Sequence, residues 1–219
     1  MTKKIVILGG VGNGTVVGQA INHAFSLGKT DMQCVGLLND RVAIGEELEG
    51  LPVIGKVDDA KRLGEDGYYF INTILRIDGQ QERIGLFESL GITDEHLATF
   101  IHPFAYVAPT VEVGPGCAIL PYVCISPGTI IGKGSLIMVG ATVGHSNSIG
   151  DYCHIAAQAC VGSYLNVGKG VHFGLNCCVR ENLIIGDYST IGMGAVLTKN
   201  VGEKEIWAGN PAKLLRKAE

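Results

Sequence analysis

An apolar residue recurs at every sixth position through the second half of the chain, from residue 101 to residue 197, without a slip in phase. A strand alternates with a period of two, and a helix cannot keep a period of six on one face, so neither element explains the pattern. Hexapeptide repeats are typical of a parallel β-helix, in which three hexapeptides form one triangular coil. We therefore expect a β-helix domain with a C-terminal tail over residues 98–219. The repeating positions are Ile101, Val107, Val113, Ile119, Ile125, Ile131, Ile137, Val143, Ile149, Ile155, Val161, Val167, Phe173, Val179, Ile185, Ile191 and Leu197.

Residues 18 apart in such a β-helix lie above one another in neighbouring coils. His154 and His172 are 18 apart and are expected to stack on one outer face, whereas His145 falls near a corner of the triangle. Three cysteines take the small inward position (Cys117, Cys153 and Cys177), and three point outward in one column (Cys124, Cys160 and Cys178). A three-sided prism with flat faces is also suited to packing around a three-fold axis.

The first hundred residues alternate short apolar runs with segments of helical spacing. We expect strands at residues 5–8, 34–38 and 68–71, and helices at residues 15–27, 56–63 and 80–90. Strands that alternate with helices predict a small parallel α/β sheet, here assigned to residues 1–97.

The carboxyl ends of these strands carry residues suited to a ligand. The first strand ends in the glycine turn Gly9–Gly14, where phosphate could approach backbone N–H groups at a helix start. The third position of the dinucleotide fingerprint is Thr15 or Val17 instead of glycine, which favours a smaller nucleotide or a nucleotide sugar over a redox dinucleotide. The other interpretation, a glycine turn that only packs helix against strand, stays open. The second and third strands end in Asn39-Asp40 and Asn72.

Composition narrows the classes of partner. The chain has 17 basic and 21 acidic residues, so no nucleic-acid footprint and no charged membrane patch is expected. No apolar run is long enough to span a bilayer. The seven cysteines include no CxxC pair and accompany no export-type segment, so we expect reduced thiols, a cytoplasmic location and no metal site.

The end of the array makes the chain recognisable. Residues 191–201 are followed by Ala208-Gly209-Asn210-Pro211-Ala212-Lys213, an ending similar to that of hexapeptide-repeat acyltransferases that use acetyl-CoA. With the His102-Pro103 junction, the whole chain resembles the bacterial family of sialic-acid O-acetyltransferases and nucleotide-aminosugar N-acetyltransferases. The likeness is greatest to enzymes that acetylate the 4-amino group of a UDP-linked 4-amino-4,6-dideoxy sugar, as in the bacillosamine pathway. It implies a Rossmann-like α/β domain, a left-handed parallel β-helix, and a homotrimer with acetyl-CoA between adjacent prisms.

The resemblance also implies roles for individual residues. His145 matches the catalytic base, and His154 matches the histidine at the acetyl-CoA end. The remaining coenzyme positions are Gly162, Ser163, Leu175 and Met193, and the nucleotide-sugar positions are Val11, Gly12, Asn13, Asn39, Asp40 and Asn72. The chain departs from the family in two places: Ser146 stands where an acidic residue usually follows the base, and Asn13 stands where a histidine is common.

The sequence therefore predicts acetyl-CoA-dependent N-acetylation of a nucleotide-linked 4-amino-4,6-dideoxy sugar, with His145 taking the proton of the attacking amine. Sugar O-acetylation is the first alternative. A zinc enzyme resembling the γ-type carbonic anhydrases, a non-catalytic sugar-nucleotide-binding protein, and acyl-enzyme chemistry through Cys160 or Cys178 are the others. The sequence leaves open whether the nucleotide is UDP, dTDP or GDP.

Overall fold

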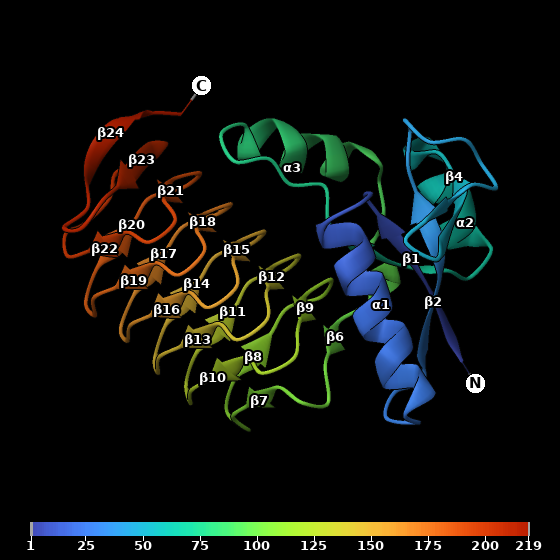
Figure 1. Cartoon of the computed structure of the whole chain (residues 1–219), viewed down its shortest axis with the longest axis horizontal. Coiled ribbons are helices and arrows are strands. Elements are labelled where there is room, and N and C mark those ends of the chain that lie inside the picture. Colours follow the sequence, from blue (N-terminus) through green and yellow to red (C-terminus); the bar gives the residue numbers. More distant parts are fainter. Residues whose placement is uncertain (1, 219) are drawn as a thin grey trace.

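The computed structural model describes residues 2–218 and contains an α/β part and a β-helix (Figure 1). In the α/β part the strands form one sheet in the order β3-β4-β2-β1-β5, in which β1, β2, β4 and β5 pair in parallel and β3 pairs antiparallel with β4. Its elements are β1 (Lys3–Leu8), α1 (Asn13–Ser26), β2 (Met32–Leu38), β3 (Glu47–Leu48), β4 (Leu51–Gly55), the 3-10 turn η1 (Val57–Asp59), α2 (Ala60–Glu65), β5 (Tyr69–Asn72), α3 (Gln80–Ser89) and the 3-10 turn η2 (Asp94–His96).

The three strands and the first and last helices expected from the sequence are present. The prediction of a helix at residues 56–63 is wrong at its start. A 3-10 turn occupies Val57–Asp59, and α2 begins only at Ala60. The physical reason is that Asp59 Oδ2 accepts the backbone N–H of Lys56 at 2.8 Å, which closes a tight turn before the α-helix. The hairpin of β3 and β4 was not expected.

The β-helix confirms the period of six. Seventeen two-residue strands follow one another with one strand per hexapeptide, and each strand pairs in parallel with strands 18 residues away. One face consists of β7 (Tyr106–Val107), β10 (Cys124–Ile125), β13 (Thr142–Val143), β16 (Cys160–Val161), β19 (Cys178–Val179) and β22 (Val196–Leu197). We call it the β7 face.

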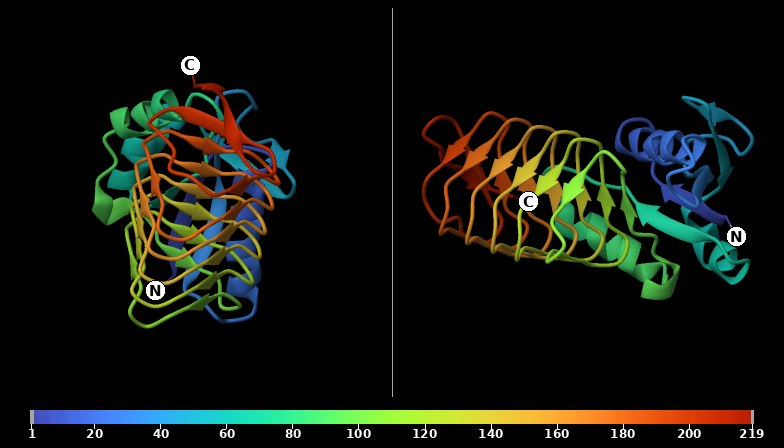
Figure 2. Two further views of the ribbon diagram at one scale, coloured as in Figure 1. Left: turned by 90° about the vertical axis from the view of Figure 1, so that its left-hand side faces the viewer. Right: turned by 90° about the horizontal axis from the view of Figure 1, so that it is seen from below.

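A second face, the β8 face, consists of β8 (Glu112–Val113), β11 (Ile130–Ile131), β14 (Ser148–Ile149), β17 (Asn166–Val167) and β20 (Ile184–Ile185). The third consists of β6 (Phe100–Ile101), β9 (Ala118–Ile119), β12 (Leu136–Ile137), β15 (His154–Ile155), β18 (His172–Phe173) and β21 (Thr190–Ile191), extended by β23 (Glu205–Ala208) and β24 (Lys213–Lys217). The stacked coils are seen obliquely in Figure 2.

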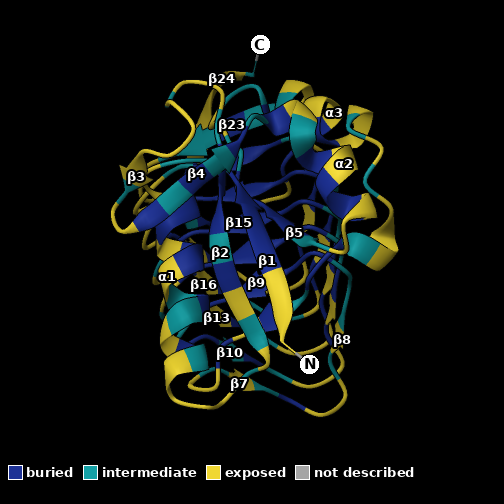
Figure 3. Cartoon of the chain, turned by 90° about the vertical axis from the view of Figure 1, so that its right-hand side faces the viewer, coloured by how far each residue is buried: buried dark blue, intermediate teal, exposed yellow. Residues whose placement is uncertain are grey.

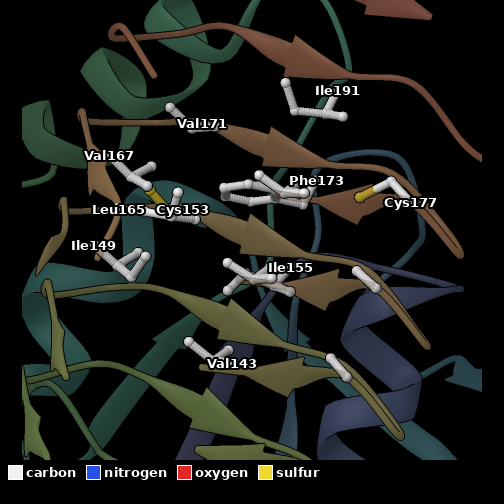
Figure 4. Close-up of a cluster of buried hydrophobic side chains, with 14 of the residues drawn as sticks. Val143, Ile149, Cys153, Ile155, Leu165, Val167, Val171, Phe173, Cys177 and Ile191 are labelled. Atoms are coloured by element: carbon white, nitrogen blue, oxygen red, sulfur yellow. The ribbon is translucent and has the colours of Figure 1, made fainter. Parts of the chain in front are cut away.

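The interior of the β-helix is filled by the repeating apolar residues. Val143, Ile149 and Ile155 of successive strands point inward, with Phe173 one coil beyond Ile155 (Figure 4). Cys117, Cys153 and Cys177 are buried among them, as expected, while Cys160 and Cys178 are exposed. The repeating residues therefore fill the interior of the β-helix, and the side chains that a ligand can reach lie on its faces and corners.

The third face is covered by the α/β part, and we call it the covered face. Val17 and Ile21 of α1 share one buried cluster with Leu120 and Leu136 of the first coils, and α1 lies between the sheet and the β-helix (Figure 1). The inner part of that sheet is dark blue in Figure 3, where β1 is buried from Ile5 onward. The inward positions of this face follow the same pattern as those of the other two, whereas its outward positions carry the apolar residues Leu120, Leu136 and Met138, which are buried against the α/β part.

Helix α3 lies along the later coils of the covered face. The rings of Phe87 and Tyr152 meet edge to face with centroids 6.0 Å apart, and Lys169 forms an ion pair with Glu88 at 2.8 Å. At the start of the helix, Gln80 Nε2 donates to Thr190 Oγ1 at 2.8 Å. These contacts hold the segment before α3 over the β-helix.

Candidate active site

A cavity of about 410 Å³ lies at the carboxyl ends of β1, β2 and β5, and we call it the strand-end cavity. Val11, Asn39 and Asp40, three of the six residues expected to bind a nucleotide sugar, line it. Gly12 precedes α1 with φ 98°, a conformation that glycine adopts without the steric cost of a Cβ atom. The glycine turn thus brings backbone to the edge of the cavity.

Asn39 and Asp40 also hold the loop that follows β2. Asn39 Nδ2 donates to Gly9 O at 3.0 Å, which links the ends of β1 and β2. Asp40 Oδ1 accepts the N–H of Val57 at 2.9 Å, and Lys56 Nζ donates to the carbonyl oxygens of Asp40 and Val42, both at 3.0 Å. The wall of the cavity is therefore preorganised by side chains.

The structure places Asn72 and Asn13 elsewhere. Asn72 is buried and does not line the strand-end cavity, because its Oδ1 accepts the N–H of Ile74 at 3.0 Å and shapes the turn after β5. Asn13 opens α1 and lines two other cavities, both of which also include Ile77 of the segment before α3. The direct contact expected of Asn72 is thus replaced by Thr73 and Ile74, which line the cavity.

Three basic side chains in the strand-end cavity were not singled out from the sequence: Arg41, Arg76 and Arg83. Arg41 follows Asp40 directly, and Arg76 stands four residues after Asn72, so a search for cations just beyond strand ends finds both. Arg83 lies on α3, and only the packing of that helix brings it to the cavity. Guanidinium groups bind phosphate oxygens in a bidentate way, so this cavity suits an anionic ligand.

A second, apolar cavity of about 520 Å³ lies on the covered face. It contains His154, Leu175 and Met193, three of the expected coenzyme residues, together with apolar side chains such as Met138 and Ile206. A smaller cavity of about 140 Å³ shares Leu75 and Arg76 with the strand-end cavity and His154 with the apolar one. The three cavities together follow a path from the strand ends to the end of the β-helix, and we call this path the groove.

His154 and His172 stack in adjacent coils, as expected, but they are buried instead of lying on an open outer face. The reason is the cover formed by the segment before α3, whose residues line the same cavity. The two Nδ1 atoms are 2.9 Å apart and the rings stack with centroids 4.9 Å apart. Burial lowers the pKa of His154 to about 3 and that of His172 to about 4, so both imidazoles are neutral and one Nδ1–H donates to the other Nδ1.

His145 occupies the corner between the β7 face and the β8 face, after β13 and before β14. Its imidazole is exposed, and its backbone N–H donates to Ser163 Oγ at 3.1 Å. Gly162 and Ser163 lie at the same corner one coil further on. A Cβ at Gly144 would lie 2.5 Å from Ser163 Oγ and 2.6 Å from Gly162 O, so only glycine allows the two coils to approach here.

The expected coenzyme residues therefore fall into two groups. Gly162 and Ser163 accompany His145 at the corner, whereas His154, Leu175 and Met193 line the groove on the covered face. Within one chain, the corner that carries His145 is the edge of the triangular prism that lies opposite the covered face. Residues 2–218 contain no group of three or more His, Cys, Asp or Glu side chains arranged to hold a metal ion. No helix in that range is long and apolar enough to cross a membrane.

Comparison with known proteins finds chains of similar structure among solved structures. The chain matches no protein-family model and no curated protein. Among solved structures it is similar to a histidine-to-asparagine variant of perosamine N-acetyltransferase from Caulobacter crescentus in complex with CoA and GDP-perosamine, with 25% identity, 99% of each chain covered and a TM-score of 0.84.

Over its whole length the chain is thus similar to an N-acetyltransferase that binds a nucleotide amino sugar, and two further solved structures are similar to it as well. The acetyltransferase domain of PglB from Neisseria gonorrhoeae, in complex with acetyl-coenzyme A, shares 25% identity over 98% of this chain and 100% of its own, with a TM-score of 0.82. WeeI from Acinetobacter baumannii shares 25% identity over 98% of this chain and 100% of its own, with a TM-score of 0.76. The resemblance expected from the sequence is confirmed.

Proposed function

We propose that the protein is an acetyl-CoA-dependent N-acetyltransferase that acts on a nucleotide-linked amino sugar. The observation that carries this proposal is the whole-length similarity to acetyltransferases solved with CoA, acetyl-CoA and GDP-perosamine. The groove supports it from this chain's own residues, because a cation-lined cavity leads to an apolar one of a size suited to an organic ligand. We assign the acceptor as a 4-amino-4,6-dideoxy sugar.

The nucleotide diphosphate is assigned to the strand-end cavity. Arg76 and Arg83 supply cations, and the start of α1 supplies the positive end of a helix of 14 residues. Val11, Asn39 and Asp40 line the same cavity, and Gly12 follows Val11 at the start of α1. Asn72 shapes the turn after β5, because its Oδ1 accepts the N–H of Ile74. Binding energy gathered here orients the amine, far from the phosphates, for reaction.

Acetyl-CoA is assigned to the apolar part of the groove, along Leu175 and Met193, with His154 at its acyl end. The exposed fraction of Met193 is 76% and that of Leu175 is 52%, which is high for apolar residues. Exposed apolar side chains at the mouth of a cavity suit a long, flexible ligand or a neighbouring chain.

The opposed positions of His145 and the groove lead to the oligomeric state. Since the corner and the covered face lie on opposite sides of one prism, His145 reaches an acceptor only in the groove of a second copy. We therefore propose a homotrimer in which each groove is completed by the partner subunit's His145, with Gly162 and Ser163 beside it.

In this site the sugar amine attacks the thioester carbonyl as His145 takes the amine proton. A C–N bond forms, the C–S bond breaks, and the proton passes from the imidazole to the leaving CoA thiolate. The backbone N–H of Ser163 is proposed to stabilise the oxyanion, since the N–H of Gly162 donates to the carbonyl oxygen of Val179 at 2.9 Å. The transfer is direct, because Cys153 is buried with its pKa raised to about 12 and the exposed Cys160 and Cys178 have no histidine next to them in sequence.

Three finer assignments complete the proposal. The α/β part is Rossmann-like and comprises residues 1–97, the β-helix is left-handed, and the second domain comprises residues 98–219. We place the protein in the cytoplasm, where acetyl-CoA and nucleotide sugars are made and where seven free cysteines stay reduced.

The test is release of CoA from acetyl-CoA across a panel of UDP-, dTDP- and GDP-linked 4-amino sugars, with the matching 4-hydroxy sugars and free sialic acid as O-acceptors. We expect turnover with one of the amino sugars and none with its 4-hydroxy analogue. Turnover with hydroxyl acceptors alone would assign the protein to sugar O-acetylation. Tight nucleotide-sugar binding without any turnover would make it a binding protein.

A further inference from the structure

His145 has a neutral neighbour where the resembling family has a carboxylate. Its Nδ1 lies 3.3 Å from Ser146 Oγ. None of the five ion pairs formed within residues 2–218 includes His145. The imidazole of one chain is therefore oriented by something other than an acidic side chain of that chain.

The aromatic ring of Tyr164 supplies a second contact. It meets the imidazole edge to face, with centroids 4.9 Å apart and planes at 86°. Tyr164 lies one coil beyond Ser146, and both residues adopt the left-handed conformation, with φ 57° and 58°. The shared corner geometry places a hydroxyl on one side of the imidazole and a ring on another.

The backbone of His145 is anchored to the next coil as well. Its N–H donates to Ser163 Oγ at 3.1 Å, and its carbonyl oxygen accepts the N–H of Tyr164 at 3.2 Å. With the backbone held at both groups, the remaining freedom of the side chain is rotation about its own bonds. Contacts on two sides of the ring restrict that rotation.

We propose that Ser146 and Tyr164 are positioning residues that present Nε2 of His145 to the acceptor amine. Ser146 Oγ accepts the Nδ1–H of the neutral imidazole, so the lone pair lies on Nε2, and the Tyr164 ring keeps the imidazole in that orientation. The inference rests on the proposed function, because it gives the base of that reaction its tautomer. In this proposal two uncharged side chains, those of Ser146 and Tyr164, orient His145 in place of a carboxylate.

Four variants separate the two contacts. Ser146→Gly removes the hydroxyl at a φ of 58° that glycine adopts readily, and Tyr164→Leu removes the ring. Each should lower kcat about 10-fold and leave KM for both substrates within about 2-fold, the effect of losing one weak contact. Tyr164→Phe keeps the ring and should keep kcat. Asn182→Gly changes the next residue of the same corner column, at φ 59°, and serves as the matched control.

Ser146→Asp tests by its pH profile whether the side chain at position 146 faces the imidazole, because a carboxylate turned away from the ring leaves the profile in place. A carboxylate beside the imidazole favours its protonated form, so the acidic limb of the kcat/KM profile should move to higher pH. The described residues in contact with His145 are Ser146, Ser163 and Tyr164, of which Tyr164 has an ionisable side chain. Tyr164→Phe in the Ser146→Asp background removes its hydroxyl, so the shift of the pH profile that remains is due to the introduced carboxylate.

The tautomer is measured directly by ¹⁵N NMR of histidine-labelled protein, with His145→Asn assigning the signal. We expect the Nδ1–H tautomer in the parent and in Asn182→Gly, and a mixture of tautomers in Ser146→Gly. Parental kcat, pH profile and tautomer in Ser146→Gly and Tyr164→Leu, together with an inactive His145→Asn, would overturn the positioning roles and leave the proposed function intact. An active His145→Asn would instead remove the proposed base.

Discussion

His154 and His172 share one hydrogen bond between their Nδ1 atoms, 2.9 Å apart, in the floor of the groove. Both imidazoles are neutral, since burial lowers the pKa of His154 to about 3 and of His172 to about 4. Nε2 of His154 is enclosed and has no hydrogen-bond partner among the described residues. The pair therefore links the stability of the groove to pH.

The direction of that link follows from the lowered pKa values. Below about pH 6.5 an unfolded histidine binds a proton, whereas the folded pair does not do so until about pH 4 or 3. The stabilising contribution is therefore present above about pH 6.5 and is lost as the pH falls toward 4.

We expect the free energy of unfolding to fall by about 1.4 kcal/mol per pH unit for each of the two histidines in this window. A His154→Gln/His172→Gln variant should show a shallower fall. Urea titrations of both proteins at one protomer concentration, from pH 7.5 to 4.5, measure this. Equal slopes would show that the pair is not the group that titrates.

The cation-lined end of the groove predicts a selective loss of substrate affinity. Arg76→Ala and Arg83→Ala should each raise KM for the nucleotide sugar about 10- to 100-fold and change kcat little, because each removes a charge-assisted contact to phosphate. KM for acetyl-CoA should stay the same. Arg62→Ala is the control, since Arg62 pairs with Asp59 and Asp66 and does not line the strand-end cavity. A uniform effect of all three variants would contradict the assignment of the phosphates.

The apolar end predicts the opposite selectivity. Met193→Glu places a carboxylate where the coenzyme track is assigned, and should raise KM for acetyl-CoA at least about 10-fold while binding of the nucleotide sugar is unchanged. Leu27→Glu, at an exposed position after α1, is the matched control. Calorimetry of each ligand separately distinguishes the two sites, and weakened nucleotide-sugar binding in Met193→Glu would argue against their separation.

The proposal that each site is shared between two copies predicts complementation. A His145→Asn chain keeps its own groove, and an Arg76→Ala/Arg83→Ala chain keeps its own His145. Mixed trimers of the two, refolded together, should therefore recover a fraction of the parental turnover at limiting nucleotide sugar. Sedimentation confirms the assembly. Recovery should be absent when the two trimers are mixed without refolding, and absence of recovery in mixed trimers would contradict the composite site.

The exposed cysteines test direct transfer. Cys160→Ser/Cys178→Ser should keep parental kcat, because neither thiol has a role in the proposed reaction. The buried Cys117 and Cys177, whose pKa values are raised to about 12 by burial, cannot replace them as nucleophiles. Loss of activity in the double variant, with a trapped acetyl-cysteine in the parent, would favour a covalent route.

The sequence was most informative where one physical constraint repeats. The period of six defined the β-helix, the stacking of His154 on His172 and the corner position of His145 without a structure. Strand ends were equally readable, because parallel strands bring their carboxyl ends to one edge. Thus Val11, Asn39 and Asp40 line the cavity that was expected there.

Tertiary contacts limited the rest. The burial of His154 depends on which face of the prism is covered by the segment before α3, and the inward hexapeptide positions are apolar on all three faces. Arg83 lies on a helix whose sequence contains no ligand-binding motif. Asn72 does not line the cavity, because its side-chain oxygen accepts a backbone hydrogen bond in the turn after β5. Ser146 and Tyr164 are 18 residues apart, yet only the conformation of the corner shows that both contact one imidazole.

The most direct test of the account is a single-turnover experiment with the parent protein and His145→Asn. Both are saturated with acetyl-CoA and the accepted nucleotide amino sugar, with binding of each ligand confirmed by calorimetry, and the products are analysed by mass spectrometry. The account predicts that the parent forms one N-acetylated nucleotide sugar per CoA released, and that His145→Asn binds both ligands but transfers at least about 100-fold more slowly. Transfer at the parental rate by His145→Asn, or acetyl placed on a hydroxyl group, would contradict it.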